Sequence, residues 1–340
     1  FFSLRNTNQM NQKKPDLLAA IDIGSHSTLL LIAAFEKDET GKEKLVPKIQ
    51  KVEICRLGED IYETGKISKE RQDELANILA KFRSTTHALG ATINEAVTTE
   101  AMRKAENSEE VLDTIEKALW KRPRIISGEE EAAYTYRAVT EWHGEEIVTI
   151  DIGGGSTELS YQKKSISIPV GALLLFKKMG AIPGPEYKAF AKETLKNNPV
   201  KAFAKKSVFL VGGTATALAM VFLNTPTFDY EKLEGIEMTL NDLEMTITRI
   251  VNLSKELRGA LPGLGGGRSD VIICGLFWLR SLLERLHVET FRISTAGLRF
   301  GVLYPPLPEV PEPEKPKRQF PFQKKNAKAE SIIKEEHAAE

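Results

Sequence analysis

Cysteine is nearly absent from this sequence, with Cys55 and Cys274 the only two among 340 residues. The two lie far apart and neither belongs to a CxxC motif, which argues against a disulfide framework, a zinc site or a redox pair. We therefore expect two buried structural thiols in a reducing compartment.

An excess of either charge is also lacking, because Lys plus Arg and Asp plus Glu both number 47. A chain with zero formal net charge has no general field that draws it to nucleic acid or anionic lipid, so any polyanion site must be local. No apolar run reaches the ~18–20 residues that span a bilayer, and the N-terminus lacks the apolar core of a signal peptide. These absences predict a cytoplasmic protein with neither a nucleic-acid nor a membrane partner.

The sequence does contain enough apolar residues for a large core, since 41% of them are hydrophobic. At roughly 100–200 residues per domain, the length predicts two domains, which we place at residues 17–142 and 143–304. Residues 1–16 are expected to be a flexible N-terminus, in which Met10 is a plausible start because the chain opens with Phe. Residues 305–340, rich in Pro, Lys and Glu, predict a disordered tail.

Both predicted domains alternate apolar strands with helices, which is typical of the α/β class. In the first, we expect strands at 17–21, 28–35, 48–57, 92–98 and 124–126, and helices from 68 to about 90, at 108–119 and from 128 to about 142. In the second, we expect strands at 147–150, 156–161, 208–211 and 290–293, and helices at 212–222, 240–253, 270–286 and from 296.

The two predicted domains open with the same sequence motif. Residues 22–25 (DIGS) and residues 151–156 (DIGGGS) each follow an apolar strand and combine an Asp, a glycine turn and a hydroxyl. Glycine lets backbone N–H groups approach a phosphate closely, because no Cβ obstructs them. A plain β-turn is the alternative for either loop alone, but the repetition favours phosphate binding.

Asp22 and Asp151 end apolar strands, where a carboxylate needs a partner, and Mg²⁺ or another divalent cation with its waters is the usual partner where phosphate is handled. A third close-approach turn, at residues 212–214 (GGT), precedes a helix whose N-terminus favours an anion. Ala296 and Gly297 could form a fourth, although a helix start with a small packing residue explains them equally well.

These loops resemble the phosphate loops of the actin/hexokinase/Hsp70 superfamily. Three further segments, residues 99–103 (TEAMR), 126–132 (ISGEEEA) and 294–301 (STAGLRFG), are similar to segments of the exopolyphosphatase / guanosine pentaphosphate phosphohydrolase (Ppx/GppA) family. The resemblance covers residues 17–304. It implies two ribonuclease-H-like lobes, as in actin-like ATPases, with a cleft between them.

The resemblance also implies a role for particular residues. Glu131 matches the catalytic base that activates the attacking water, and Asp151 and Glu158 match acids that bind Mg²⁺ or lie beside the scissile phosphate. The chemistry agrees, because a phosphoanhydride needs a positioned water, charge neutralisation and a carboxylate within reach. For Glu129 and Glu130, complementarity to the helix dipole is the simpler explanation.

The complete predicted site combines three sets of residues. The catalytic set is Glu131, Asp151 and Glu158; the metal set is Asp22, Asp151 and Glu158; the phosphate-binding set is Gly24, Ser25, His26, Ser27, Arg103, Gly153, Gly154, Gly155, Ser156, Thr157, Gly212, Gly213 and Thr214.

Three positions depart from the family pattern, and they concern the substrate contacts more than the chemistry. His26 stands where the family usually has Asn, Leu174 where many relatives have Arg, and Glu100 where a small residue is usual. Arg56 and Arg268 resemble family positions, although structural ion pairs would explain both. A polyphosphate track could be formed by lysines that are otherwise simply solvated: Lys163, Lys164, Lys201, Lys205 and Lys206.

The predicted function is removal of the terminal phosphate from inorganic polyphosphate, with guanosine pentaphosphate (pppGpp) as an alternative substrate. The chain ends before the C-terminal helical domains of long family members, which predicts weak processivity and a preference for short chains. A small-molecule kinase and a non-catalytic nucleotide sensor are the competing classes, and both are disfavoured by the segment around Glu131. A homodimer is possible.

Overall fold

The structure is a computed structural model that describes residues 16–144, 146–204, 206–265 and 268–305. The predictions for the N-terminus before Asp16 and for the tail after Pro305 lie outside the described residues. Within the described chain, no helix combines the length and the apolar character needed to cross a membrane.

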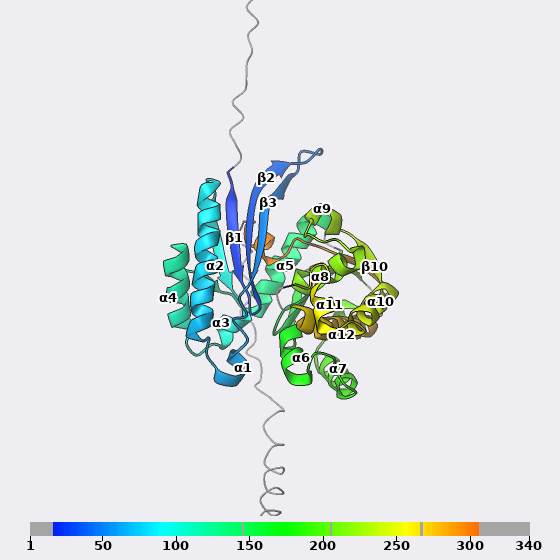
Figure 1. Cartoon of the computed structure of the whole chain (residues 1–340). Helices are drawn as coiled ribbons and strands as arrows, with labels where there is room; N and C mark the ends of the chain where they lie inside the picture. Colours follow the sequence, from blue (N-terminus) through cyan, green and yellow to red (C-terminus); the bar gives the residue numbers. More distant parts are fainter. Residues whose placement is uncertain (1–15, 145, 205, 266–267, 306–340) are drawn as a thin grey trace, which may run out of the picture. The chain divides into compact units, whose positions relative to one another are not determined.

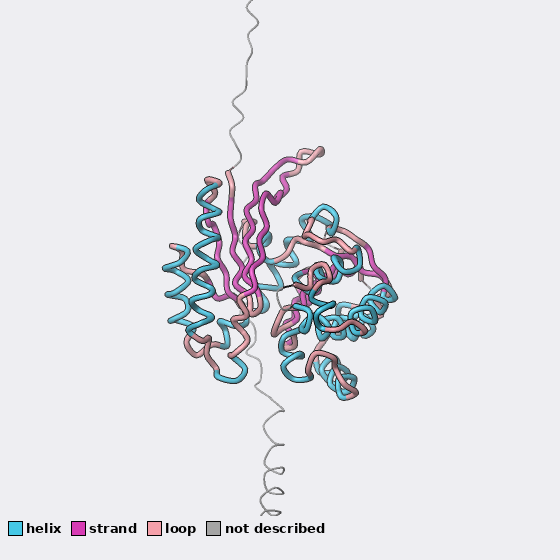
Figure 2. Tube along the Cα trace, viewed as in Figure 1, coloured by secondary structure: helices cyan, strands magenta, loops and turns pink. Residues whose placement is uncertain are grey.

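The first sheet has the strand order β3-β2-β1-β4-β5 (Figures 1 and 2). Strands β1 (Leu18–Ile23), β2 (Ser27–Lys37) and β3 (Glu43–Ile54) form an antiparallel meander, and β4 (Thr92–Thr98) and β5 (Arg124–Ile125) extend it in parallel. The helices of this half are α1 (Ile61–Thr64), α2 (Lys69–Ala88), α3 (Glu100–Lys104) and α4 (Ser108–Leu119).

The second sheet has the order β10-β11-β9-β6-β7-β8. Its strands are β6 (Ile147–Ile152), β7 (Thr157–Tyr161), β8 (Lys164–Ile168), β9 (Ser207–Val211), β10 (Glu237–Thr239) and β11 (Thr290–Ile293). Its helices are α6 (Ala172–Met179), α7 (Glu186–Asn197), α8 (Gly212–Leu223), α9 (Tyr230–Leu233), α10 (Leu240–Val251), α11 (Lys255–Gly259) and α12 (Arg268–Leu286), with a 3₁₀ turn at Val200–Phe203.

The two sheets repeat one arrangement, because β3-β2-β1-β4 in the first corresponds to β8-β7-β6-β9 in the second. In each, an antiparallel meander is continued by a parallel strand, and the strand that ends in the Asp lies in the middle. Asp22 is level with Val97 of the parallel neighbour, and Asp151 with Val211. The predicted pair of ribonuclease-H-like lobes is confirmed, whereas the exact domain boundary at 142/143 stays a prediction.

Apolar alternation explains how the outer layers form. One face of the first sheet, with Ile21 and Ile32, packs against α2 and α4 through residues such as Leu79 and Ile115. The central strands of the second sheet are apolar on both faces, as expected for strands that are covered on two sides. Helices α8 and α12 cover one face of this sheet. Trp278 of α12 is fully buried in that core.

Between the sheets lie two helices, each of which packs against the sheet of the other half. Helix α5 (Gly128–His143) follows β5 in the chain but packs on β6, β7 and β8. Helix α13 (Leu298–Gly301) follows β11 but packs on β1 and β2. The two helices touch so closely that a Cβ on Gly301 would overlap the backbone of Tyr134. The lobes are therefore joined by exchanged helices.

Most expected elements occur where the sequence predicted them, and the differences have local causes. The last helix begins at Leu298, not Ala296, because the preceding residues are held as a loop: the Thr295 N–H and hydroxyl both donate to the Glu234 carboxylate at 2.6 Å. Strand β3 begins earlier than predicted, at Glu43, since it pairs with the whole of the long β2. Strand β8 and helices α6 and α7 were not predicted.

Candidate active site

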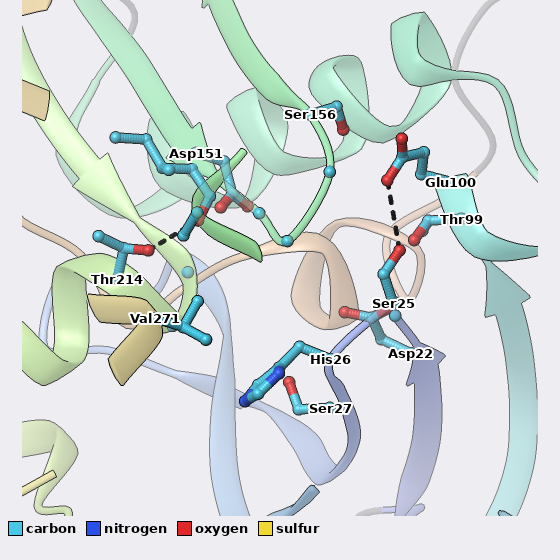
Figure 3. Close-up of a pocket in the computed structure, with 18 of the residues that line it drawn as sticks. Asp22, Ser25, His26, Ser27, Thr99, Glu100, Asp151, Ser156, Thr214 and Val271 are labelled. Carbon is cyan, nitrogen blue, oxygen red and sulfur yellow. Dashed lines mark hydrogen bonds between the residues drawn. The ribbon is translucent and has the colours of Figure 1, made fainter. Parts of the chain in front are cut away.

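One cavity is lined by all three predicted glycine loops and by the N-terminal part of α5 (Figure 3). Its lining includes fourteen residues of the predicted site: Asp22, Gly24, Ser25, His26, Ser27, Glu131, Asp151, Gly153, Gly154, Gly155, Ser156, Gly212, Gly213 and Thr214. The predicted convergence of the loops is therefore present in the structure.

The first two loops pack directly against each other. A Cβ placed on Gly154 would lie 3.4 Å from the Cβ of Ser25, which is van der Waals contact. The second loop is in turn tied to the start of α6, because the N–H groups of Ala172 and Leu174 donate to the carbonyl oxygens of Gly153 and Gly154 at 2.9 and 3.0 Å. Leu174, the position where many relatives have Arg, is buried.

The third loop requires glycine at its first position. Gly212 has a φ of 80°, in the left-handed region, and a Cβ there would overlap the Asp151 carboxylate. The Thr214 hydroxyl donates to the carbonyl oxygen of Ile152 at 2.9 Å, which fixes this loop against the second one. The Asp151 carboxylate therefore lies directly beside the first glycine of the third loop.

Four carboxyl groups at or beside the cavity have pKa values that burial raises. Burial raises the pKa of Asp22 to about 7, with a contribution from Asp151, and raises the pKa of Asp151 to about 6. Burial and the neighbouring Asp151 raise the pKa of Glu158 to about 8. Burial, and next the charge of Glu158, also raise the pKa of Glu131 well above its usual range. Such a cluster favours either bound protons or a bound cation.

Glu131 is held in place by the start of α5. Ser127 accepts a hydrogen bond from the Glu130 N–H, and the Glu130 carboxylate accepts one from the Ser127 N–H, which forms a capping box. Glu131 follows directly, and its carboxylate accepts hydrogen bonds from both terminal nitrogens of Arg103 at 3.3 Å. Glu130 therefore stabilises the N-terminus of α5 through this capping box, whereas the sequence had suggested complementarity to the helix dipole.

Three predicted site residues do not line the cavity. Arg103 lies in the last turn of α3, and in addition to its bonds to Glu131 it donates to the Ile126 carbonyl oxygen at 2.6 Å. Glu158 is level with Asp151 across the β6–β7 pair and accepts a hydrogen bond from the Ser167 hydroxyl at 2.8 Å.

Thr157 is the third predicted residue outside the cavity. It is completely buried; its hydroxyl donates to the Val170 carbonyl oxygen at 2.6 Å and accepts a hydrogen bond from the Trp278 indole at 2.9 Å. The hydroxyl therefore joins β7 to α12 and is directed away from the cavity, which does not support the predicted role of its side chain in phosphate binding.

Arg268, for which an ion pair was the alternative, lines the cavity at the first residue of α12. No described carboxylate forms an ion pair with it, and burial lowers the pKa of its guanidinium. The sequence indicated this residue only by its resemblance to a family position and did not include it in the predicted site. The other lining residues outside the prediction are Leu29, Thr99, Glu100, Ile152, Ala172, Val271 and Ile272.

Arg56 does not line the cavity but lies beside His26, whose carbonyl oxygen accepts a hydrogen bond from the Arg56 N–H at 3.0 Å. Both ring nitrogens of His26 are buried without a hydrogen-bond partner among the described residues. Burial, followed by the positive charges of Arg268 and Arg56, lowers the pKa of His26 to about 4. The imidazole is therefore neutral at pH 7 and offers one donor and one acceptor.

The remaining sequence candidates lie elsewhere. Lys163, Lys164 and Lys201 are exposed, and none of the described lysines lines the cavity, which supports the solvated-surface alternative; Lys205 lies outside the described residues. Ala296 is buried, and a Cβ added to Gly297 would lie only 3.2 Å from the Val211 side chain, so these two fit a packing role.

The fit of a divalent cation can be judged from the carboxylates. Among the described residues, no group of three or more His, Cys, Asp or Glu side chains is arranged as a metal site, so the predicted set of Asp22, Asp151 and Glu158 does not form such a group. Mg²⁺, however, commonly binds one or two carboxylates plus waters and phosphate oxygens. Asp22, whose buried Oδ1 has no hydrogen-bond partner among the described residues, and Asp151 fit that mode.

The paired lobes and the cavity between their glycine loops define a phosphate-handling protein of the actin-like ATPase fold. The model of the Ppx/GppA phosphatase family matches residues 36–310, so the chain belongs to this family. Members of the family are enzymes that hydrolyse phosphoanhydride bonds.

Known relatives agree with this assignment. Exopolyphosphatase 1 of Mycobacterium tuberculosis is 27% identical over 308 residues, which cover 84% of this chain and 87% of that protein. Guanosine-5'-triphosphate,3'-diphosphate pyrophosphatase of Aeromonas hydrophila is 28% identical over 305 residues, which cover 85% of this chain and 59% of that protein. The Aquifex aeolicus PPX-GPPA enzyme is similar in structure, with a TM-score of 0.70, 29% identity, and coverage of 85% of this chain and 98% of that one.

Proposed function

We propose that this protein hydrolyses the terminal phosphate of inorganic polyphosphate, with the described cavity as its active site. The central observation is that the Glu131 carboxylate lies in the same cavity as both Asp-led glycine loops. The similarity to exopolyphosphatase of M. tuberculosis over most of both chains supports polyphosphate as the substrate.

In the proposed mechanism, backbone N–H groups of the second loop and the hydroxyls of Ser25 and Ser156 donate to oxygens of the terminal phosphoryl group. The positive charge of Arg268 faces the same cavity and favours a polyanion there. The residues that would hold Mg²⁺ are Asp22 and Asp151, and when bound the ion neutralises charge on the phosphoryl oxygens.

Glu131 is proposed to accept the proton of the attacking water. The water oxygen then forms a bond to the terminal phosphorus, the bond from that phosphorus to the bridging oxygen breaks, and the shortened chain leaves with the electron pair. Arg103 favours the ionised carboxylate of Glu131, whereas burial and the charge of Glu158 favour the protonated form. A raised pKa makes the ionised carboxylate a stronger base toward the attacking water, and Arg103 favours that ionised form.

The pyrophosphatase of A. hydrophila supports a second candidate, removal of the 5' phosphate of pppGpp, since its name describes a guanosine substrate of this kind. A kinase or a sensor is disfavoured because Glu131 lies in the cavity. The cytoplasmic location, the dimer and the absence of a nucleic-acid partner stay predictions.

The test measures Mg²⁺-dependent phosphate release from tripolyphosphate, long-chain polyphosphate and pppGpp. We expect Glu131→Gln to lower kcat by roughly 10²–10⁴-fold, the usual contribution of a general base. Glu129→Gln is the matched control, because it removes the same charge from the same helix turn at a residue that does not line the cavity. Undiminished release by Glu131→Gln, or no release from any substrate by the wild type, would contradict the proposal.

A further inference from the structure

Glu100, the first residue of α3, places its carboxylate in the cavity from the side of the first sheet (Figure 3). The residue is only 7% exposed. A Cβ on Gly155 would overlap this carboxylate, so the carboxylate occupies the space directly beside the last glycine of the second loop. The Ser25 hydroxyl of the first loop donates to the same carboxylate at 3.4 Å.

The carboxylate therefore contacts one residue from each of the two phosphate loops. A carboxylate and a phosphate present oxygens of the same kind to hydrogen-bond donors, and donors that suit one also suit the other. The glycine at position 155 and the hydroxyl at position 25 are the features that were expected to receive a phosphate. In the structure, an acidic side chain of the protein occupies this place.

We propose that Glu100 competes with a phosphate group of the substrate for the space between Ser25 and Gly155, and so sets the affinity for polyanions. This inference rests on the proposed function of the cavity. An incoming phosphate meets both the volume and the negative charge of the carboxylate and has to displace it. Lys104, one helical turn along α3, already forms an ion pair with Glu100 and is more exposed, so it can keep the displaced carboxylate paired.

Equilibrium binding tests this role without requiring turnover. Binding of inorganic phosphate is measured by calorimetry, in the presence of Mg²⁺, for the wild type, Glu100→Gln and Glu100→Ala. The Gln variant removes the charge and keeps the size, whereas the Ala variant removes both. We expect phosphate to bind about tenfold more tightly to at least one of the two Glu100 variants, because both remove a like charge at short range.

Glu106→Gln is the matched control, because Glu106 lies six residues further along the same segment, is exposed, and does not line the cavity. Its affinity for phosphate should equal that of the wild type. Tighter binding by both Glu100 variants assigns the effect to charge, and tighter binding by Glu100→Ala alone assigns it to volume; either result supports competition. With tripolyphosphate as substrate, the corresponding change should appear as a lower KM.

Unchanged or weaker phosphate binding in both Glu100 variants would overturn the proposed competition. If the wild type still releases phosphate from tripolyphosphate, that result leaves the hydrolase proposal intact. If no protein of the series releases phosphate from any substrate, the hydrolase proposal fails instead, and the binding comparison still decides the role of Glu100.

Discussion

At the scale of single residues, His26 differs in its electrostatic state from an ordinary surface histidine. Its ring is buried beside two arginines, and its pKa is lowered to about 4. At this residue the native state therefore binds fewer protons than the unfolded chain between pH 4 and pH 6.5, so the contribution of His26 to stability falls as the pH drops through this window.

Replacing His26 with Asn, the residue usual in the family, should remove this dependence on pH. A pKa of about 4 in the native state, against an ordinary value of 6.5, corresponds to about 2 kcal/mol of stability lost through His26 between pH 7.5 and pH 5. The raised pKa values of Asp22, Asp151 and Glu158 act in the opposite direction in both proteins, so the difference between the two proteins reports the contribution of His26. Urea denaturation of both proteins at the two pH values measures the difference. An equal change of stability with pH in both proteins would show that His26 is protonated freely in the native state.

The residues of the site also show what the sequence can and cannot predict. Glycine loops that follow apolar strands could be recognised because the tight turn depends only on residues next to each other in the sequence. In the structure these loops line one cavity. The hydroxyl of Thr157 could not be assigned in this way, since its partners, Val170 and Trp278, come from distant segments. Glu100 was visible only as a departure from a pattern, because its contact with Gly155 depends on how α3 packs.

At the scale of elements, the N-terminus of α5 both begins the helix and positions Glu131. Its capping box stabilises the helix end, and the residue that follows the box is Glu131. The direction in which Glu131 points therefore depends on a turn that is held by the side chains of Ser127 and Glu130. Helix α10 has a capping box of the same kind, formed by Thr239 and Asp242, far along the chain from the cavity residues of α5.

We expect Ser127→Ala to lower both stability and activity, and Thr239→Ala to lower stability alone. Each loses a side-chain cap worth about 1 kcal/mol in the free energy of unfolding. Only Ser127→Ala loosens the turn that holds Glu131, so only its kcat should fall, by several fold. Chemical denaturation and steady-state kinetics on both variants measure this; an equal kcat in the two would show that the cap does not position Glu131.

Helix and strand boundaries were predicted well where apolar periodicity was strong, as for β4 and α4. The unpredicted α6 and α7 follow the second loop, where runs of Lys and Pro obscure the periodicity of the sequence. The first residues of α6 are nevertheless important to the site, because they hold the second loop through backbone hydrogen bonds, which no side-chain pattern reveals.

At the scale of the whole molecule, the cavity exists only because both sheets contribute to it. A ligand that contacts loops from both lobes stabilises the native state over the unfolded one and links the lobes to each other. We expect tripolyphosphate with Mg²⁺, at about a hundred times its Kd, to raise the midpoint of thermal unfolding by roughly 5 °C.

Calorimetric melting of Glu131→Gln, which should bind without rapid hydrolysis, measures this shift, with chloride salts of the same ionic strength as the control. Chelation of the divalent cation should remove most of the rise. A ligand that shifts only one of two separate transitions would show that it contacts a single lobe.

The exchanged positions of α5 and α13 have a consequence for how the protein can be divided. A piece that ends before α13 lacks the helix that covers β1 and β2, and a piece that begins after α5 lacks the helix that covers β6, β7 and β8. Each half of the gene, expressed separately, would thus encode a sheet with one bare apolar face. The two products could cover these apolar faces only by associating with each other.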